Sequence, residues 1–128
     1  IEPLMKVKLT IEPSNVAQAA GIGALSDDAF LAESVRLNSE GIAYFYREFE
    51  RLGLKYFKSA GNFVMIDLET PERVQEIYSE LKRRGVFVRP LTAFRLPHCL
   101  RITVGLPDEN EFCIEMLDEV MKESSVRA

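Results

Sequence analysis

The 128-residue sequence is 47% hydrophobic and 28% charged, a composition typical of one ordinary globular domain. Its sixteen basic and twenty acidic residues give a net charge of −4, which argues against a nucleic-acid or membrane-surface partner. Two cysteines and one histidine are too few for a disulfide framework or a four-ligand zinc site, so we expect no metal, and two packed thiols in a reducing cytoplasm. The longest uncharged stretch, 13–26, is too short and too polar to cross a membrane.

Two helices are predicted in the first half of the chain. Residues 15–25 are rich in alanine and glycine, and Ser14 is suited to cap them. Residues 27–52 carry a stripe with alternating spacings of four and three, which is typical of a helix with one buried face. The stripe consists of Leu31, Val35, Asn38, Ile42, Phe45, Phe49 and Leu52. Gly53 follows and favours the left-handed conformation that ends a helix.

After Gly53 the pattern changes to that of strands. Residues 54–56 and 63–68 are rich in aromatic and β-branched side chains, and a turn-like run separates them. A short strand is predicted over 86–89, ending at Pro90, and another over 100–104.

Two further helices complete the predicted fold. Thr70 and Pro71 have the chemistry of an N-cap and a first helical position, and Gly85 ends that helix. The last helix begins near Pro107, with an apolar face that includes Phe112. The predicted fold class is therefore a two-layer α/β (α+β) domain, in which a small mixed sheet has its helices mainly on one face.

Two arginines are the candidate binding residues. The alternation in 100–104 directs Arg101 away from the core, and Arg89 ends the strand before a loop. A guanidinium on a rigid strand suits bidentate capture of a carboxylate or phosphate, although a solvated surface arginine is the alternative interpretation. No phosphate loop or nucleophilic triad is recognisable, and we expect His98 to be a solvent-facing loop residue.

Four motifs resemble the carboxyl-terminal third of the histidinol-phosphate aminotransferases, in the same order and with the same gaps. They are SAGNFV at 59–64, GVFVRPL at 85–91, LPHCLRITVG at 96–105 and EN at 109–110. Upstream, PSNVAQAA at 13–20 resembles the stretch by which that family leaves its large domain. The first residue, Ile1, is not methionine, which also suggests a piece of a longer protein.

The resemblance implies a fold-type I, pyridoxal-phosphate-dependent, homodimeric and cytoplasmic enzyme. Such an enzyme moves an amino group between histidinol phosphate and 2-oxoglutarate, with its Schiff-base lysine in the large domain. By that resemblance Arg101 matches the arginine that grips the acidic group of the substrate, and Arg89 matches a second one near the phosphate. Residues 1–26 would be the interdomain linker and helix, and 27–128 the small domain, which packs against its own large domain. We expect no catalytic residue and no bound cofactor in this chain.

The sequence departs from the family at two places. Leu106 stands where the family usually has Thr or Ser as a helix cap, and residues 10–13 differ from the aromatic and asparagine-rich linker. The alternatives are therefore the domain of a related aromatic aminotransferase or threonine-phosphate decarboxylase, a self-standing α/β ligand-binding or regulatory module, and an interaction domain that dimerises through 15–25.

Overall fold

The computed structural model describes residues 13–127, so Lys6, Lys8 and the linker residues 10–12 lie outside the described part of the chain. The chain forms two compact units, Ile1–Val35 and Arg36–Ala128. The second unit carries the whole sheet. No helix within 13–127 combines the length and apolarity needed to span a bilayer.

The helix α2 (Asn15–Leu25) lies in the first unit and has the predicted bounds. Its N-cap is also as predicted, because Ser14 Oγ accepts a hydrogen bond from the backbone N–H of Ala17 at 3.2 Å. None of its residues is buried. A helix without a buried face draws little stability from packing, so α2 depends on its propensity and its cap.

The long helix α3 (Asp28–Arg51) begins in the first unit, where Asp27 Oδ1 accepts from the backbone N–H of Phe30 at 2.9 Å. The predicted stripe lies on a helix, but it is exposed over this first part. Leu31 and Val35 are 51% and 58% exposed, and Phe30 is 64% exposed. Helical spacing therefore indicates an apolar face there, but not its burial.

The second part of α3 is the buried part. Phe45 and Phe49 have no exposed surface and stack with ring centroids 5.5 Å apart. Gly41 is buried here, and a Cβ at this position would clash with the Val104 side chain, so the helix can pack this closely only with glycine. The helix is followed by Gly53 at φ 66°, the left-handed residue that the sequence predicts.

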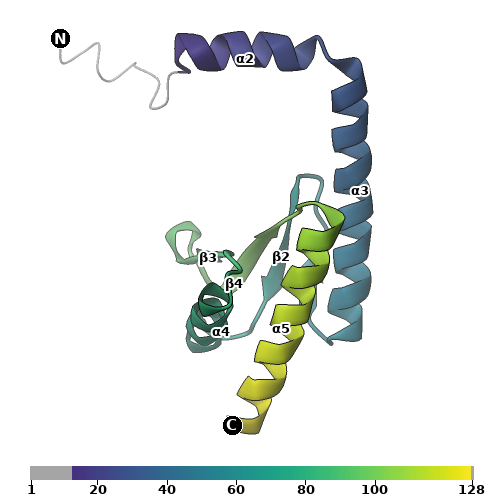
Figure 1. Cartoon of the computed structure of the whole chain (residues 1–128). Coiled ribbons are helices and arrows are strands. Elements are labelled where there is room, and N and C mark those ends of the chain that lie inside the picture. Colours follow the sequence, from purple (N-terminus) through teal and green to yellow (C-terminus); the bar gives the residue numbers. More distant parts are fainter. Residues whose placement is uncertain (1–12, 128) are drawn as a thin grey trace, which may run out of the picture. The chain divides into compact units, whose positions relative to one another are not determined.

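The sheet has four strands in the order β1-β2-β4-β3, and Figure 1 shows α4 and α5 beside it. The strands are β1 (Lys55–Phe57), β2 (Phe63–Asp67), β3 (Arg89–Leu91) and β4 (Leu96–Thr103). All three pairings are antiparallel, whereas a mixed sheet was expected. The crossover from β2 to β3 does make these two strands parallel, but β4 lies between them and pairs antiparallel with both.

The first two strands differ from the predicted bounds by one residue at one or both ends, and the last two differ more. The third strand contains Pro90 instead of ending before it, and residues 86–88 are not in a strand. The fourth begins at Leu96 and runs through Pro97. Pro90 is tolerated because β3 is an edge strand, where a missing N–H breaks no inner ladder, and the register shifts directly after it.

The helix α4 (Pro71–Arg83) follows β2 and has the predicted cap. Thr70 Oγ1 accepts from the backbone N–H of Arg73 at 3.2 Å, and Pro71 occupies the first turn. Gly85, at φ 84°, follows the helix. The N-terminal proline and C-terminal glycine thus mark this helix as the sequence indicated.

The helix α5 (Pro107–Arg127) starts as predicted and is capped without a hydroxyl at Leu106. Glu109 Oε2 accepts from the backbone N–H of Leu106 at 2.8 Å, which is the N3-to-N-cap half of a capping box, and Leu106 has no side-chain oxygen to provide the other half. Phe112 was expected on the buried face but is 46% exposed. The buried stripe of α5 passes through its neighbour Cys113.

One hydrophobic core fills the space between the sheet and the helices α3, α4 and α5, which confirms the expected layering. Its members are Phe45, Phe49, Leu54, Val64, Ile66, Leu68, Val74, Ile77, Leu81, Val86, Leu100, Ile102, Cys113, Ile114, Leu117 and Val120. Because strand residues alternate, the opposite face of the sheet carries a different set, which we call the outer face. It consists of Lys55, Phe57, Phe63, Met65, Asp67, Arg89, Cys99, Arg101 and Thr103.

Candidate functional site

The structure brings the two predicted arginines together on the outer face. Arg89 of β3 and Arg101 of β4 are direct cross-strand partners. Their neighbours along β4, Leu100 and Ile102, are buried in the core, as the alternation predicted. Directly opposite residues in an antiparallel pair have Cβ atoms about 5 Å apart, so the two arginine side chains start from neighbouring positions of the sheet.

Arg101 is held by an aromatic side chain of the next strand. Its guanidinium carbon lies 5.0 Å from the centre of the Phe63 ring, within the range of a cation–π contact. Met65 is its cross-strand partner on β2. The Nε atom of Arg101 is buried and has no hydrogen-bond partner. A buried donor without an acceptor is costly in a folded protein, and a bound anion would satisfy it.

Arg89 has a similar but more exposed setting. Its guanidinium carbon lies 5.3 Å from the centre of the Phe94 ring, in the short 3-10 turn Thr92–Phe94 that joins β3 to β4. Pro90 follows it and fixes the backbone at the edge of the sheet. Two aromatic rings therefore each hold one of the two guanidinium groups.

The pair has no ion-pair partner among the residues that the structure describes. Among residues 13–124, neither Arg89 nor Arg101 forms an ion pair, whereas Arg84 binds Glu119 at 2.6 Å and Glu123 at 2.7 Å. Like charges directly opposite each other in a sheet are destabilising. The outer face thus holds two cations with free donors, an arrangement suited to bidentate binding of a multiply charged anion such as a phosphate monoester.

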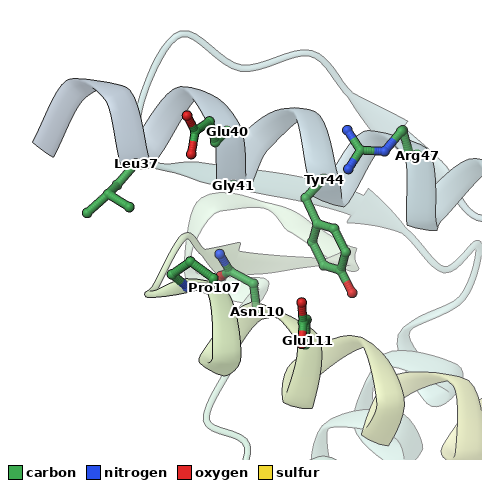
Figure 2. A pocket seen from close by; sticks show the side chains of 8 residues that line it. All are labelled: Leu37, Glu40, Gly41, Tyr44, Arg47, Pro107, Asn110 and Glu111. Atoms are coloured by element: carbon green, nitrogen blue, oxygen red, sulfur yellow. The ribbon is translucent and has the colours of Figure 1, made fainter. Parts of the chain in front are cut away.

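Two surface hollows are not lined by these arginines. The first, about 190 Å³, lies between α3 and α5 and is shown in Figure 2. Eight residues line it: Leu37, Glu40, Gly41, Tyr44, Arg47, Pro107, Asn110 and Glu111. Burial, followed by the nearby carboxylates Glu48 and Glu111, raises the pKa of Tyr44. The second hollow, of about 330 Å³, lies beside 85–88. Neither has a converging set of functional groups comparable to the arginine pair.

A second cluster on the sheet was not foreseen from the sequence. His98 was expected in a solvent-facing loop, but it lies half-buried within β4. Ligand atoms of Asp67, His98 and Cys99 all lie within 4.8 Å of one another. The backbone N–H of Glu69, followed by Lys55, holds the pKa of Asp67 below its usual range, and burial raises the pKa of the Cys99 thiol. Sequence spacing could not show this group, because its members come from two strands.

The chain is similar to known proteins over most of its length. Residues 2–114 match the family model described as aminotransferase class I and II. Histidinol-phosphate aminotransferase 2 of Ralstonia nicotianae is 38% identical over 98% of this chain, and histidinol-phosphate aminotransferase of Symbiobacterium thermophilum is 40% identical over 96%. In both cases the match covers 34% of the relative, so the chain spans about a third of the length of these curated proteins.

The fold of this chain is also similar to that of solved aminotransferase structures. Histidinol-phosphate aminotransferase from Sinorhizobium meliloti, solved in complex with pyridoxal-5'-phosphate, matches 96% of this chain and 34% of its own, with TM-score 0.80 and 26% identity. The enzyme from Clostridium acetobutylicum matches 95% of this chain with TM-score 0.73 and 23% identity, which supports the fold alone.

Proposed function

The chain belongs to the class I and II aminotransferase family, and we propose that it is the substrate-clamping C-terminal domain of a histidinol-phosphate aminotransferase. The parent polypeptide would transfer an amino group between histidinol phosphate and 2-oxoglutarate, in histidine biosynthesis. Relatives that this chain matches over about a third of their length carry that name, which supports the proposal. The role of this chain would be to hold the phosphorylated end of the substrate.

The observation that carries the proposal is the unpaired arginine pair. Arg101, with its buried and unsatisfied Nε, would donate to two oxygens of the substrate phosphate, and Arg89 would donate to a third. A phosphate monoester carries a charge of about −1.5 to −2 near neutral pH, which neutralises two guanidinium groups. Phe63 and Phe94 keep the two planes in place, so less side-chain freedom is lost on binding.

The family implies pyridoxal phosphate in the parent enzyme, but none of the described lysines is suited to form the Schiff base that holds this cofactor. The cofactor is held through a lysine that is poised by its surroundings. Here Lys55 and Lys122 are ion-paired surface residues with 73% and 74% of their side chains exposed, and Lys58 and Lys82 are also exposed. We therefore place the Schiff-base lysine in the part of the parent that this chain does not cover, and expect the chain alone to neither transaminate nor bind the cofactor.

The proposed partner of this domain is the large domain of the same polypeptide. We propose that residues 1–26 are the linker and interdomain helix and that 27–128 form the small domain. The support is the uncovered apolar surface of α2 and the start of α3, which suits packing against another domain. Its exposed members are Val16, Ile22, Leu25, Phe30, Leu31 and Val35. A cytoplasmic homodimer is the family's form and is proposed for the parent on that ground.

A donor comparison on the full-length parent tests the proposed function. With 2-oxoglutarate as acceptor, histidinol phosphate should give a kcat/KM at least tenfold above phenylalanine. Threonine phosphate tests the decarboxylase alternative, because release of carbon dioxide from it would place the parent in that related branch. A preference for phenylalanine would contradict the proposal and favour an aromatic aminotransferase.

A further inference from the structure

Asp67 and Cys99 on the outer face, together with the adjacent His98 of β4, form a second group of functional side chains, one row of the ladder away from the arginines. Lys55, Asp67 and Cys99 are aligned across β1, β2 and β4, and His98 precedes Cys99. We propose that Asp67, His98 and Cys99 form a binding site for one transition-metal ion of the zinc class. The site contains neither Arg89 nor Arg101, which are the proposed phosphate-binding residues, so this inference does not depend on the proposed function.

The geometry of the three side chains is close to that of a metal site. Their ligand atoms lie within 4.8 Å of one another, on strands fixed by the β2–β4 ladder. Zinc binds sulfur at about 2.3 Å and nitrogen or oxygen at about 2.0–2.2 Å, so ligand atoms of a tetrahedral site lie somewhat closer than this. Small side-chain rotations are enough, because the backbone already presents Asp67 and Cys99 side by side.

The carboxylate of Asp67 is oriented before any ion binds. Its Oδ1 accepts from the backbone N–H of Glu69 at 2.9 Å, and Glu69 has the unusual φ of 71° that this turn requires. Non-glycine residues at positive φ are uncommon and are enriched at functional positions. The hydrogen bond leaves Oδ2 as the ligand atom, in the same way that outer-shell bonds orient the ligands of known metal sites.

A cation already occupies the position next to this carboxylate. Lys55 Nζ lies 3.2 Å from Asp67 Oδ2, and the lysine side chain is 73% exposed while that of Asp67 is only 10% exposed. The lysine end of this ion pair is largely solvated, so Lys55 can move fully into solvent at small cost. A divalent ion would then take over the neutralisation of Asp67 and gain the sulfur and nitrogen ligands as well.

The ligand set selects the class of metal. A thiolate, an imidazole and a carboxylate suit zinc or cobalt, whereas magnesium and calcium prefer oxygen ligands throughout. Cys99 is fully buried, and burial, followed by the Asp67 carboxylate, raises the pKa of its thiol. Binding therefore exchanges the thiol proton for the metal: the S–H bond breaks, the sulfur–metal bond forms, and one proton is released to solvent. With three protein ligands, a fourth position would remain for water.

Metal titration of the untagged, reduced 128-residue chain tests the proposal. Equilibrium dialysis should give one zinc ion per chain, and cobalt should produce the absorbance of a thiolate-to-metal transition. Cys99→Ser and His98→Gln should each weaken zinc binding by about tenfold or more, and Cys99→Ser should abolish the cobalt band. Lys55→Met should tighten binding by about two- to fivefold, because it removes the competing cation.

The second cysteine provides the matched control. Cys113 is also buried, but in the core between α5 and the sheet, away from Asp67 and His98. Cys113→Ser should leave zinc affinity and the cobalt band unchanged. The proposal is overturned if the wild-type chain gives no cobalt–thiolate band, or if His98→Gln, which keeps both cysteines, binds zinc as tightly as wild type. Circular dichroism of each variant verifies that the fold is retained.

Discussion

Replacing Arg101 by methionine should stabilise the ligand-free chain while removing anion binding. Methionine keeps an unbranched apolar stem beside Met65 and Phe63 but removes the charge. The buried, unsatisfied Nε costs about 1–3 kcal/mol, and the like charge of Arg89 opposite it adds about 0.2–1 kcal/mol. Loss of the cation–π contact subtracts about 0.5–1 kcal/mol.

These terms leave a net gain of about 1.5 kcal/mol in the free energy of unfolding for Arg101→Met. For a chain of this size the gain corresponds to a rise of about 5 °C in Tm. A variant that removes a charge kept unpaired for a ligand is expected to gain stability and to lose ligand binding. A surface arginine without a function would show neither effect.

Urea and thermal denaturation in phosphate-free buffer measure the stability, and the rise of Tm with added inorganic phosphate measures the binding. The control is Arg84→Met, which deprives Glu119 and Glu123 of their partner and should lower the free energy of unfolding by about 1 kcal/mol or less. The reasoning is refuted if Arg101→Met loses more than about 1 kcal/mol of stability, or if phosphate stabilises it as much as wild type.

Three further predictions concern neighbouring features. Phe63→Leu should weaken phosphate binding by about two- to fivefold in a titration, whereas Phe57→Leu, on the same face but without an arginine contact, should leave it unchanged. The pKa of Asp67 is lowered in the folded chain, chiefly by the hydrogen bond from the Glu69 N–H. The stabilisation from ionised Asp67 is therefore present above about pH 4 and is lost as the pH falls through the lower folded pKa. Asp67→Asn should reduce the loss of stability at acidic pH, and an unchanged loss would contradict this. Gly41→Ala should lower stability by about 1–3 kcal/mol in urea denaturation, and a neutral result would show that α3 can shift.

The helices were predictable from the sequence because their signals are local. Hydrophobic spacing, the caps Ser14 and Thr70, and the glycine after α3 and α4 all lie within one or two turns of the ends that they define. Leu31 and Val35 of the stripe are exposed, and local spacing carries no information about burial there. Helical periodicity predicts an apolar face, but not what covers it.

The strands and the sites were less predictable because they depend on pairing. The two prolines in 90–97 indicated strand ends, yet Pro90 lies inside β3, where the edge position and a register shift allow it, and Pro97 lies near the start of β4. Alternation placed Arg101 on the outer face, but only the ladder shows that Arg89 lies opposite it. The contacts with Phe63 and Phe94 and the cluster around His98 also require the tertiary fold.

The central claim is that Arg101 grips the phosphate of the substrate, and one kinetic comparison tests it most directly. In the full-length parent, kcat/KM of wild type and Arg101→Ala is measured with histidinol phosphate and with unphosphorylated histidinol. A charge-assisted contact is worth about 1.5–3 kcal/mol, so Arg101→Ala should lower kcat/KM for histidinol phosphate by on the order of a hundredfold, with little change for histidinol. A loss below about threefold, or an equal loss for both substrates, would contradict the account.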